Sequence, residues 1–201
     1  MSTFNAIFSL MAKMTVLTTL GEPAIKTIKF DFRQHKITPD SFAQVRKAIE
    51  DGRIAVAMNP KLSVTGTYDS GSNCLELVDG TSLYMERKAL IVHECLHAWF
   101  DLKLVKNMTV KTSEAAAHLA QCIYARKKVG EAVAVTDRLQ GSNPAKDHVF
   151  DLAWTLAGKV INSGKSPTQA EVDDLEDAIA KCPSYKSEAN DIAQWNGVPK
   201  A

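Results

Sequence analysis

The stretch of 22 residues from Leu83 to Leu104 constrains the fold more than any other feature of the sequence, because it contains neither glycine nor proline. At 3.6 residues per turn it is long enough for six helical turns. Around its middle, apolar side chains cover nearly the whole circumference of such a helix. This pattern is typical of a buried helix.

The middle of this predicted helix contains His93, Glu94 and His97, which form the pattern HExxH. A helix places residues four apart on one face, so both imidazoles can reach the same metal ion. Zinc fits such a pair because it accepts neutral imidazole nitrogens, and the glutamate between them can act as a general base on a zinc-activated water. The alternative is a buried network of hydrogen bonds among these side chains without a metal.

The motif and its surroundings, roughly Arg53 to Arg126, resemble the zincin metallopeptidases, and within them the gluzincins. This resemblance implies a catalytic zinc site whose third protein ligand is a glutamate on the following helix. The longer metzincin motif, HExxHxxGxxH, is absent, because neither its glycine nor its third histidine is present here. The resemblance therefore implies a zinc-dependent peptidase of the gluzincin kind.

Glu114 is the expected third ligand, at the start of an alanine-rich predicted helix from Ser113 to Lys127. The alternative for Glu114 is an acidic first turn that complements the helix dipole. Asp101 lies about 12 Å along the helix from His93, at 1.5 Å per residue, too far to share its ion. It is either a carboxylate that orients His97 or a solvated charge at the helix end.

His118 follows Glu114 by one helical turn. Thermolysin-like gluzincins have an asparagine before the ligand glutamate and an aspartate four residues after it, whereas Ser113 and His118 stand at these positions here. His118 is therefore a candidate catalytic residue that stabilises an oxyanion, a partner of a zinc ligand, or an ordinary packed histidine. Three weaker candidates for an oxyanion donor are Tyr124, Arg126 and His148.

The expected fold class is α+β: a small zincin-like domain with a mostly antiparallel sheet of about 3–5 strands on the HExxH helix, and a helical C-terminal half. The predicted strands are Lys26–Phe32, Ile54–Met58, Ser63–Tyr68 and Cys74–Val78, the last two as a hairpin. Further helices are predicted from Asp40 to Ile49, from Pro144, and from a capping box at Thr168 and Glu171.

The domain organisation predicted from these elements is an N-terminal arm or helix over residues 1–21, one zincin-like domain over residues 22–182, and an irregular tail over residues 183–201. Residues 4–20 are moderately apolar, but Lys13 interrupts them and no basic region precedes them. This is not the pattern of a cleaved signal peptide. We expect a cytoplasmic protein, or one exported by a route without such a peptide.

Composition excludes several function classes. The 24 basic and 23 acidic side chains give a formal charge of +1, and neither sign forms a long block, so we expect no nucleic-acid partner. No stretch approaches the roughly 18 consecutive apolar residues of a membrane span. The four cysteines contain no CxxC pair and are expected to be reduced thiols.

The sequence thus predicts a zinc-dependent hydrolase, by resemblance a peptidase that cleaves amide bonds of peptides or proteins. The substrate is expected as an extended strand along a sheet edge, with Cys74–Val78 as that edge. Two alternatives stay open: a non-catalytic interaction protein that keeps the zincin scaffold, and a zinc amidase acting on small or cell-wall substrates. The sequence does not indicate the oligomeric state.

Overall fold

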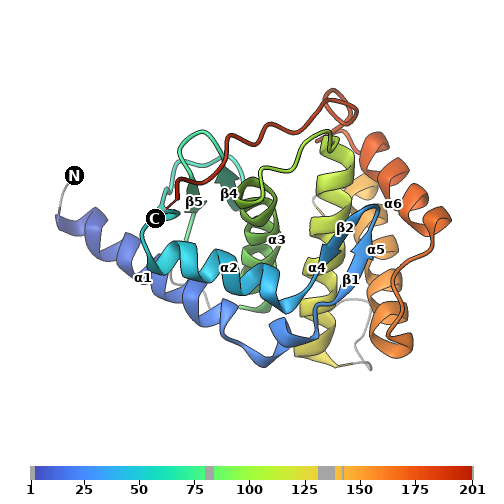
Figure 1. Cartoon of the computed structure of the whole chain (residues 1–201), viewed down its shortest axis with the longest axis horizontal. Coiled ribbons are helices and arrows are strands. Elements are labelled where there is room, and N and C mark those ends of the chain that lie inside the picture. Colours follow the sequence, from blue (N-terminus) through green and yellow to red (C-terminus); the bar gives the residue numbers. More distant parts are fainter. Residues whose placement is uncertain (1–2, 80–83, 131–138, 142, 201) are drawn as a thin grey trace. The chain divides into compact units, whose positions relative to one another are not determined.

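The computed structural model of the chain describes residues 3–79, 84–130, 139–141 and 143–200. Within these residues the chain forms six α-helices, one 3₁₀-helix and five short strands (Figure 1). The fold class is therefore α+β. The chain divides into two compact units, each described by itself below. Unit 1 consists of Met1–Ile25, Asp40–Lys106 and Gln194–Ala201, and unit 2 of Lys26–Pro39 and Asn107–Ala193.

Unit 1 is built around a three-stranded sheet and the helix that contains the HExxH motif. The strands are β3 (Ala55–Met58), β4 (Gly66–Asp69) and β5 (Cys74–Leu77), in the order β3-β5-β4. Strand β5 pairs parallel with β3 and antiparallel with β4. The motif helix α3 (Met85–Leu102) packs on β4 and β5, and α1 (Thr3–Leu20) packs on β3 and α3.

Helix α3 confirms the helix predicted from the stretch without glycine or proline. Its side chains are buried almost continuously from Ala89 to Asp101, as expected for a helix whose apolar residues cover nearly the whole circumference. The preceding helix of unit 1, α2 (Pro39–Glu50), is amphipathic and ends before Gly52, which has a φ of +75°. A left-handed residue directly after a helix is usually glycine, because glycine adopts this conformation without strain.

Unit 2 is mainly a bundle of three helices, α4 (Val110–Val129), α5 (Pro144–Ser163) and α6 (Gln169–Lys181), which pack on one another (Figure 1). Each helix has a side-chain cap at its start, from Thr109, Asn143 and Thr168 respectively. The capping box at Thr168 is confirmed. The Thr168 side chain accepts a hydrogen bond from the backbone N–H of Glu171, and the Glu171 side chain accepts one from the backbone N–H of Thr168.

Unit 2 also contains β1 (Phe30–Phe32) and β2 (His35–Ile37), which form an antiparallel hairpin. The predicted strand Lys26–Phe32 is thus correct only at its end. A 3₁₀-helix, η1 (Pro23–Thr27), occupies its first residues. Residues 183–200 contain turns and one isolated bridge, between Thr109 and Ile192.

The sheet differs from the prediction in two ways. It is not mostly antiparallel, because one of the two strand pairings around β5 is parallel. The predicted substrate-binding edge, Cys74–Val78, is also wrong, since β5 is the central strand and β3 and β4 are the edges. Both differences have the same cause: β5 pairs with β4 in the hairpin on one side, and it also pairs with β3 on its other side. Cross-strand pairing between distant segments cannot be obtained from hydrophobic alternation.

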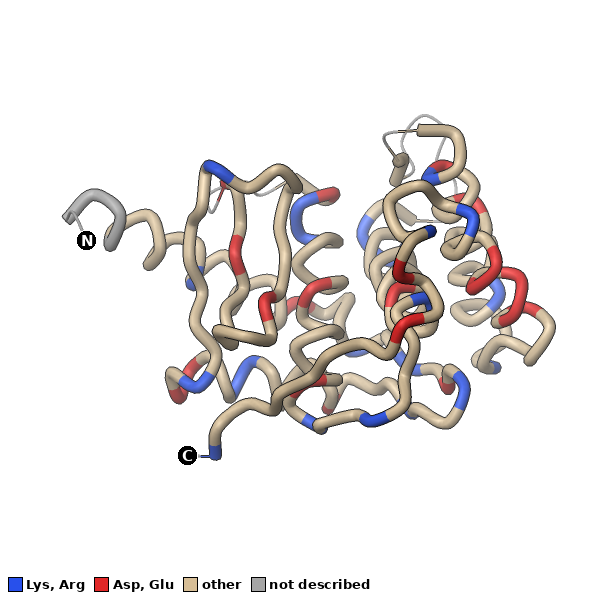
Figure 2. Tube along the Cα trace, turned by 90° about the horizontal axis from the view of Figure 1, so that it is seen from above, with Lys and Arg blue, Asp and Glu red and all other residues tan. Residues whose placement is uncertain are grey.

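Figure 2 shows Lys and Arg interspersed with Asp and Glu along the described part of the trace, without a long run of either sign. No helix in the described residues is both long and apolar enough to cross a membrane. The four cysteines are free thiols with buried side chains, and burial raises the pKa of the Cys74 thiol to about 11.

Candidate metal centre

The two motif histidines meet on one face of α3. The Nε2 atom of His93 lies 3.1 Å from the Nε2 atom of His97, and the ring planes are inclined at 74°. Both side chains are buried. Two arrangements have this distance: a hydrogen bond between neutral imidazoles, and a pair of ligands of one ion. Two nitrogens that lie 2.0–2.1 Å from a tetrahedral zinc ion are about 3.3 Å apart. The observed distance is therefore close to that of two ligands of one zinc ion.

Glu94 is held in place by the sheet of the same unit. Its Oε2 atom accepts a hydrogen bond of 2.9 Å from the backbone N–H of Tyr68 in β4. In β4 this N–H points toward Glu94, so the outer edge of the strand faces the motif helix at this residue. The carboxylate is buried and fixed by a backbone group. The glutamate between the two histidines is thus positioned by the edge strand.

Asp101 is not the solvated charge at a helix end that was one of its two predicted roles. Its side chain is fully buried. Its Oδ2 atom accepts a hydrogen bond of 2.7 Å from the hydroxyl of Tyr68, and its Oδ1 atom accepts one of 2.8 Å from the backbone N–H of Gly197. Burial, and next the hydrogen bond to Asp101, raise the pKa of the Tyr68 hydroxyl far above its usual value. The phenol is therefore a neutral donor across the physiological range.

Trp195 is a residue of this region that the sequence did not single out. Its ring is stacked on that of His97, with 6.0 Å between the ring centroids and 26° between the planes. It also lies 6.2 Å from the ring of Phe100. Trp195 belongs to the C-terminal segment of unit 1, almost 100 residues after the motif. No local spacing connects these residues, so only the fold reveals the contact.

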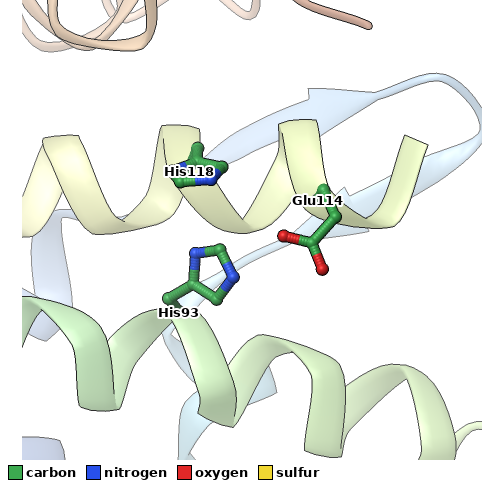
Figure 3. A group of neighbouring side chains, drawn as sticks. All are labelled: His93, Glu114 and His118. Carbon is green, nitrogen blue, oxygen red and sulfur yellow. The ribbon is translucent and has the colours of Figure 1, made fainter. Parts of the chain in front are cut away.

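In unit 2, Glu114 and His118 lie one turn apart on α4, and a carboxylate oxygen of Glu114 is within 4.8 Å of a ring nitrogen of His118 (Figure 3). Helix α4 begins at Val110, three residues earlier than predicted, so Glu114 is not in its first turn. The proposed alternative for Glu114, an acidic first turn that complements the helix dipole, is therefore wrong. His118 is buried and contacts Phe150 edge to face, at 4.9 Å between ring centroids.

The three weaker candidates for an oxyanion donor differ in their surroundings. Arg126 lies over the ring of Trp154 at 5.1 Å and donates a hydrogen bond to its backbone oxygen, which is a packing role between α4 and α5. His148 is exposed on α5. Tyr124 is fully buried in α4. The contacts of Arg126 and the exposure of His148 favour neither as part of a buried centre.

The structure thus brings the predicted residues together as two pairs, one in each unit: His93 with His97, and Glu114 with His118. Figure 3 labels His93 on α3 and the second pair on α4. Histidine nitrogens and a carboxylate oxygen are the donor set that catalytic zinc sites use. In comparisons with known proteins, no family model, no curated protein and no solved structure matches this chain.

Proposed function

We propose that the protein is a zinc-dependent peptidase whose metal is bound by His93, His97 and Glu114. The distance of 3.1 Å between the two Nε2 atoms carries this proposal, because it is close to the separation that two ligands of one tetrahedral zinc ion have. Glu94, which follows the first histidine, supplies the general base that the motif requires. The resemblance to the gluzincins supports the same assignment.

Zinc, when bound, supplies a Lewis acid that polarises a carbonyl and lowers the pKa of water to about 7. Glu94 accepts the proton of the attacking water and delivers it to the leaving amine. The backbone N–H of Tyr68 restricts the position of this carboxylate through a hydrogen bond to its Oε2 atom. A structural zinc site would not need a base beside its ligands.

Glu114 completes the ligand set in this proposal, and His118 is placed beside the same ion. Their ligand atoms are within 4.8 Å of each other on α4, so an ion bound to the carboxylate has the imidazole as a neighbour. Glu114 lies in the second turn of α4, so an acidic first turn that complements the helix dipole does not account for it. His118 then acts as an oxyanion donor or as an additional ligand.

The proposed substrate is a polypeptide in extended conformation, because a peptide can add to the edge of a sheet through its main chain. The proposed binding edge is β4, in place of the segment Cys74–Val78 predicted from the sequence. It is an edge strand, and its outward N–H at Tyr68 points to the proposed base. A chain laid along β4 would therefore present an amide bond near Glu94.

The test combines metal analysis with hydrolysis of a quenched fluorescent peptide library. We expect about one zinc ion per chain in the wild type and in Glu94→Gln, with the rate in Glu94→Gln lower by at least about a hundredfold, because only the base is lost. His93→Ala should lose the zinc. His148→Ala is the matched control, since it removes an exposed histidine. Wild-type metal content and rate in both motif variants would refute the site.

Glu114→Ala and His118→Ala test whether the two pairs share an ion. We expect the first variant to weaken zinc binding in a chelator competition by at least about tenfold, as loss of a ligand should. If His118 is only a neighbour of the ion, its variant should keep the affinity and lose rate. Unchanged zinc affinity in Glu114→Ala would show that Glu114 is not a ligand of the ion bound by His93 and His97. Hydrolysis of small amides without any polypeptide cleavage would instead overturn the substrate class.

A further inference from the structure

The C-terminal segment Gln194–Ala201 belongs to unit 1 and is fastened to it at several points. The hydroxyl of Ser70, in the turn after β4, donates a hydrogen bond of 2.8 Å to the backbone oxygen of Gln194. The backbone N–H of Gly197 donates to the buried carboxylate of Asp101 on α3. Trp195 lies between these two attachments, so its position is set from both sides.

A helix alone does not fix the direction in which a histidine ring presents its nitrogens. The second side-chain torsion of histidine is broad, so neighbouring groups must restrict it. For His97, the stacked ring of Trp195 is such a group, with planes inclined at only 26°. Rotation of the imidazole about its Cβ–Cγ bond would break this stacking. It would also move Nε2 away from the Nε2 atom of His93.

Asp101 connects this stacking to the core of unit 1. A buried carboxylate is costly unless donors compensate its charge, and here the donors are Tyr68 in β4 and Gly197 in the C-terminal segment. The carboxylate therefore holds strand, helix and segment together one turn after His97. The contact between Trp195 and His97 is thus connected to the hydrogen bonds around the buried carboxylate of Asp101.

We propose that Trp195 is a positioning residue for His97, and that the bond between Asp101 and Gly197 keeps it on the imidazole ring. The inference rests on the proposed zinc site and goes beyond it, because it assigns a role to the C-terminal segment. Groups that orient a metal ligand typically change metal affinity by 10–100-fold when they are removed. The C-terminal segment thereby controls how long the protein retains its zinc.

The first measurement is the rate of zinc release from the full chain into an excess of a chromogenic chelator. We expect Trp195→Ala to release zinc at least about tenfold faster than the wild type. Trp195→Phe should restore most of the slow release, because a phenyl ring can still stack on the imidazole. The visible spectrum of the cobalt(II) form gives an independent signature, and it should change in the alanine variant and not in the phenylalanine variant.

A second variant leaves every side chain of the proposed site intact. Gly197 has a φ of +85°, and a Cβ atom added to it would lie 3.2 Å from Leu104. Gly197→Ala should therefore displace the segment and speed zinc release in the same way as Trp195→Ala. Gly52→Ala is the matched control: its φ is +75°, nothing lies within 4 Å of the added atom, and zinc release should stay at the wild-type rate.

The outcomes separate the inference from the proposed function. A wild-type protein that binds no zinc would refute the proposed function itself. If the wild type binds zinc through His93, and both Trp195→Ala and Gly197→Ala release it at the wild-type rate, the positioning role alone is wrong. Faster release that accompanies loss of helical circular dichroism would also overturn it, because the segment would then only stabilise the fold.

Discussion

Replacement of Tyr68 by phenylalanine isolates one hydrogen bond on which the arrangement of unit 1 depends. The variant keeps the aromatic ring and removes the hydroxyl that donates to Asp101 over 2.7 Å. Both partners are buried, and the acceptor is a carboxylate. Hydrogen bonds to charged groups contribute about 1.5–3 kcal/mol, and a buried acceptor that loses its donor costs a similar amount. We expect Tyr68→Phe to lower the free energy of unfolding at pH 7 by about 2 kcal/mol.

The same bond predicts a pH dependence. In the folded protein the pKa of the Tyr68 hydroxyl is raised, first by burial and then by Asp101, whereas in the unfolded chain it has its usual value near 10. The stability from this group is therefore fully present below pH 10 and is lost as the pH rises toward the folded pKa. Between pH 9 and 11 the difference between wild type and variant should shrink by about 1.4 kcal/mol.

The assay is urea unfolding followed by circular dichroism at several pH values between 7 and 11. Tyr84→Phe provides the control, because it removes a hydroxyl from a side chain that is 77% exposed. Its unfolding free energy should match that of the wild type. A Tyr68→Phe variant as stable as the wild type at pH 7, or a difference that grows between pH 9 and 11, would show that the phenol does not support the carboxylate.

Two further predictions concern unit 2. The pKa of Glu171 is lowered to about 2, first by its hydrogen bond to Lys159 and then by the capping box. The stability from this group is therefore present above pH 4.5 and is lost as the pH falls toward 2. Glu171→Gln should flatten the dependence of the unfolding free energy on pH over that range, and an unchanged dependence would contradict the assignment. Arg33→Met should cost about 3 kcal/mol because it leaves Glu176 buried without its cation, and Arg33→Met/Glu176→Met should recover most of this loss in chemical unfolding. A double variant no more stable than the single one would argue against this ion pair.

Features that depend on local sequence were predicted well. The motif helix follows from a long stretch without glycine or proline, and the caps at Asn143 and Thr168 place the starts of α5 and α6 correctly. Each of these signals acts within one or two helical turns, so neighbouring residues contain all the information. The spacing of His93 and His97 is of the same kind. A helix brings residues four apart together whatever the rest of the chain does.

The hairpin β1–β2 shows where local signals end. Its turn contains Arg33 with a φ of +54°, a conformation that a side chain other than glycine or asparagine adopts rarely. No glycine marks this turn in the sequence, so the second strand was missed. The Arg33 guanidinium binds the buried carboxylate of Glu176 on α6, more than 140 residues away. The residue with the unusual backbone conformation is thus paired with a distant carboxylate, and no pattern within the hairpin encodes this ion pair.

Asp101 combines both kinds of information. Its place on the motif helix, one turn after His97, can be read from the sequence, and this position suggested either an orienting carboxylate or a solvated charge. The choice between them depends on whether donors from elsewhere meet it. They come from Tyr68 and from Gly197, which are separated from it by 33 and 96 residues. A buried carboxylate is stable only with such partners, so its burial implies that strand β4 and the C-terminal segment fold against α3 together. The carboxylate therefore acts on His97 through the segment that it fastens, by way of the stacked ring of Trp195.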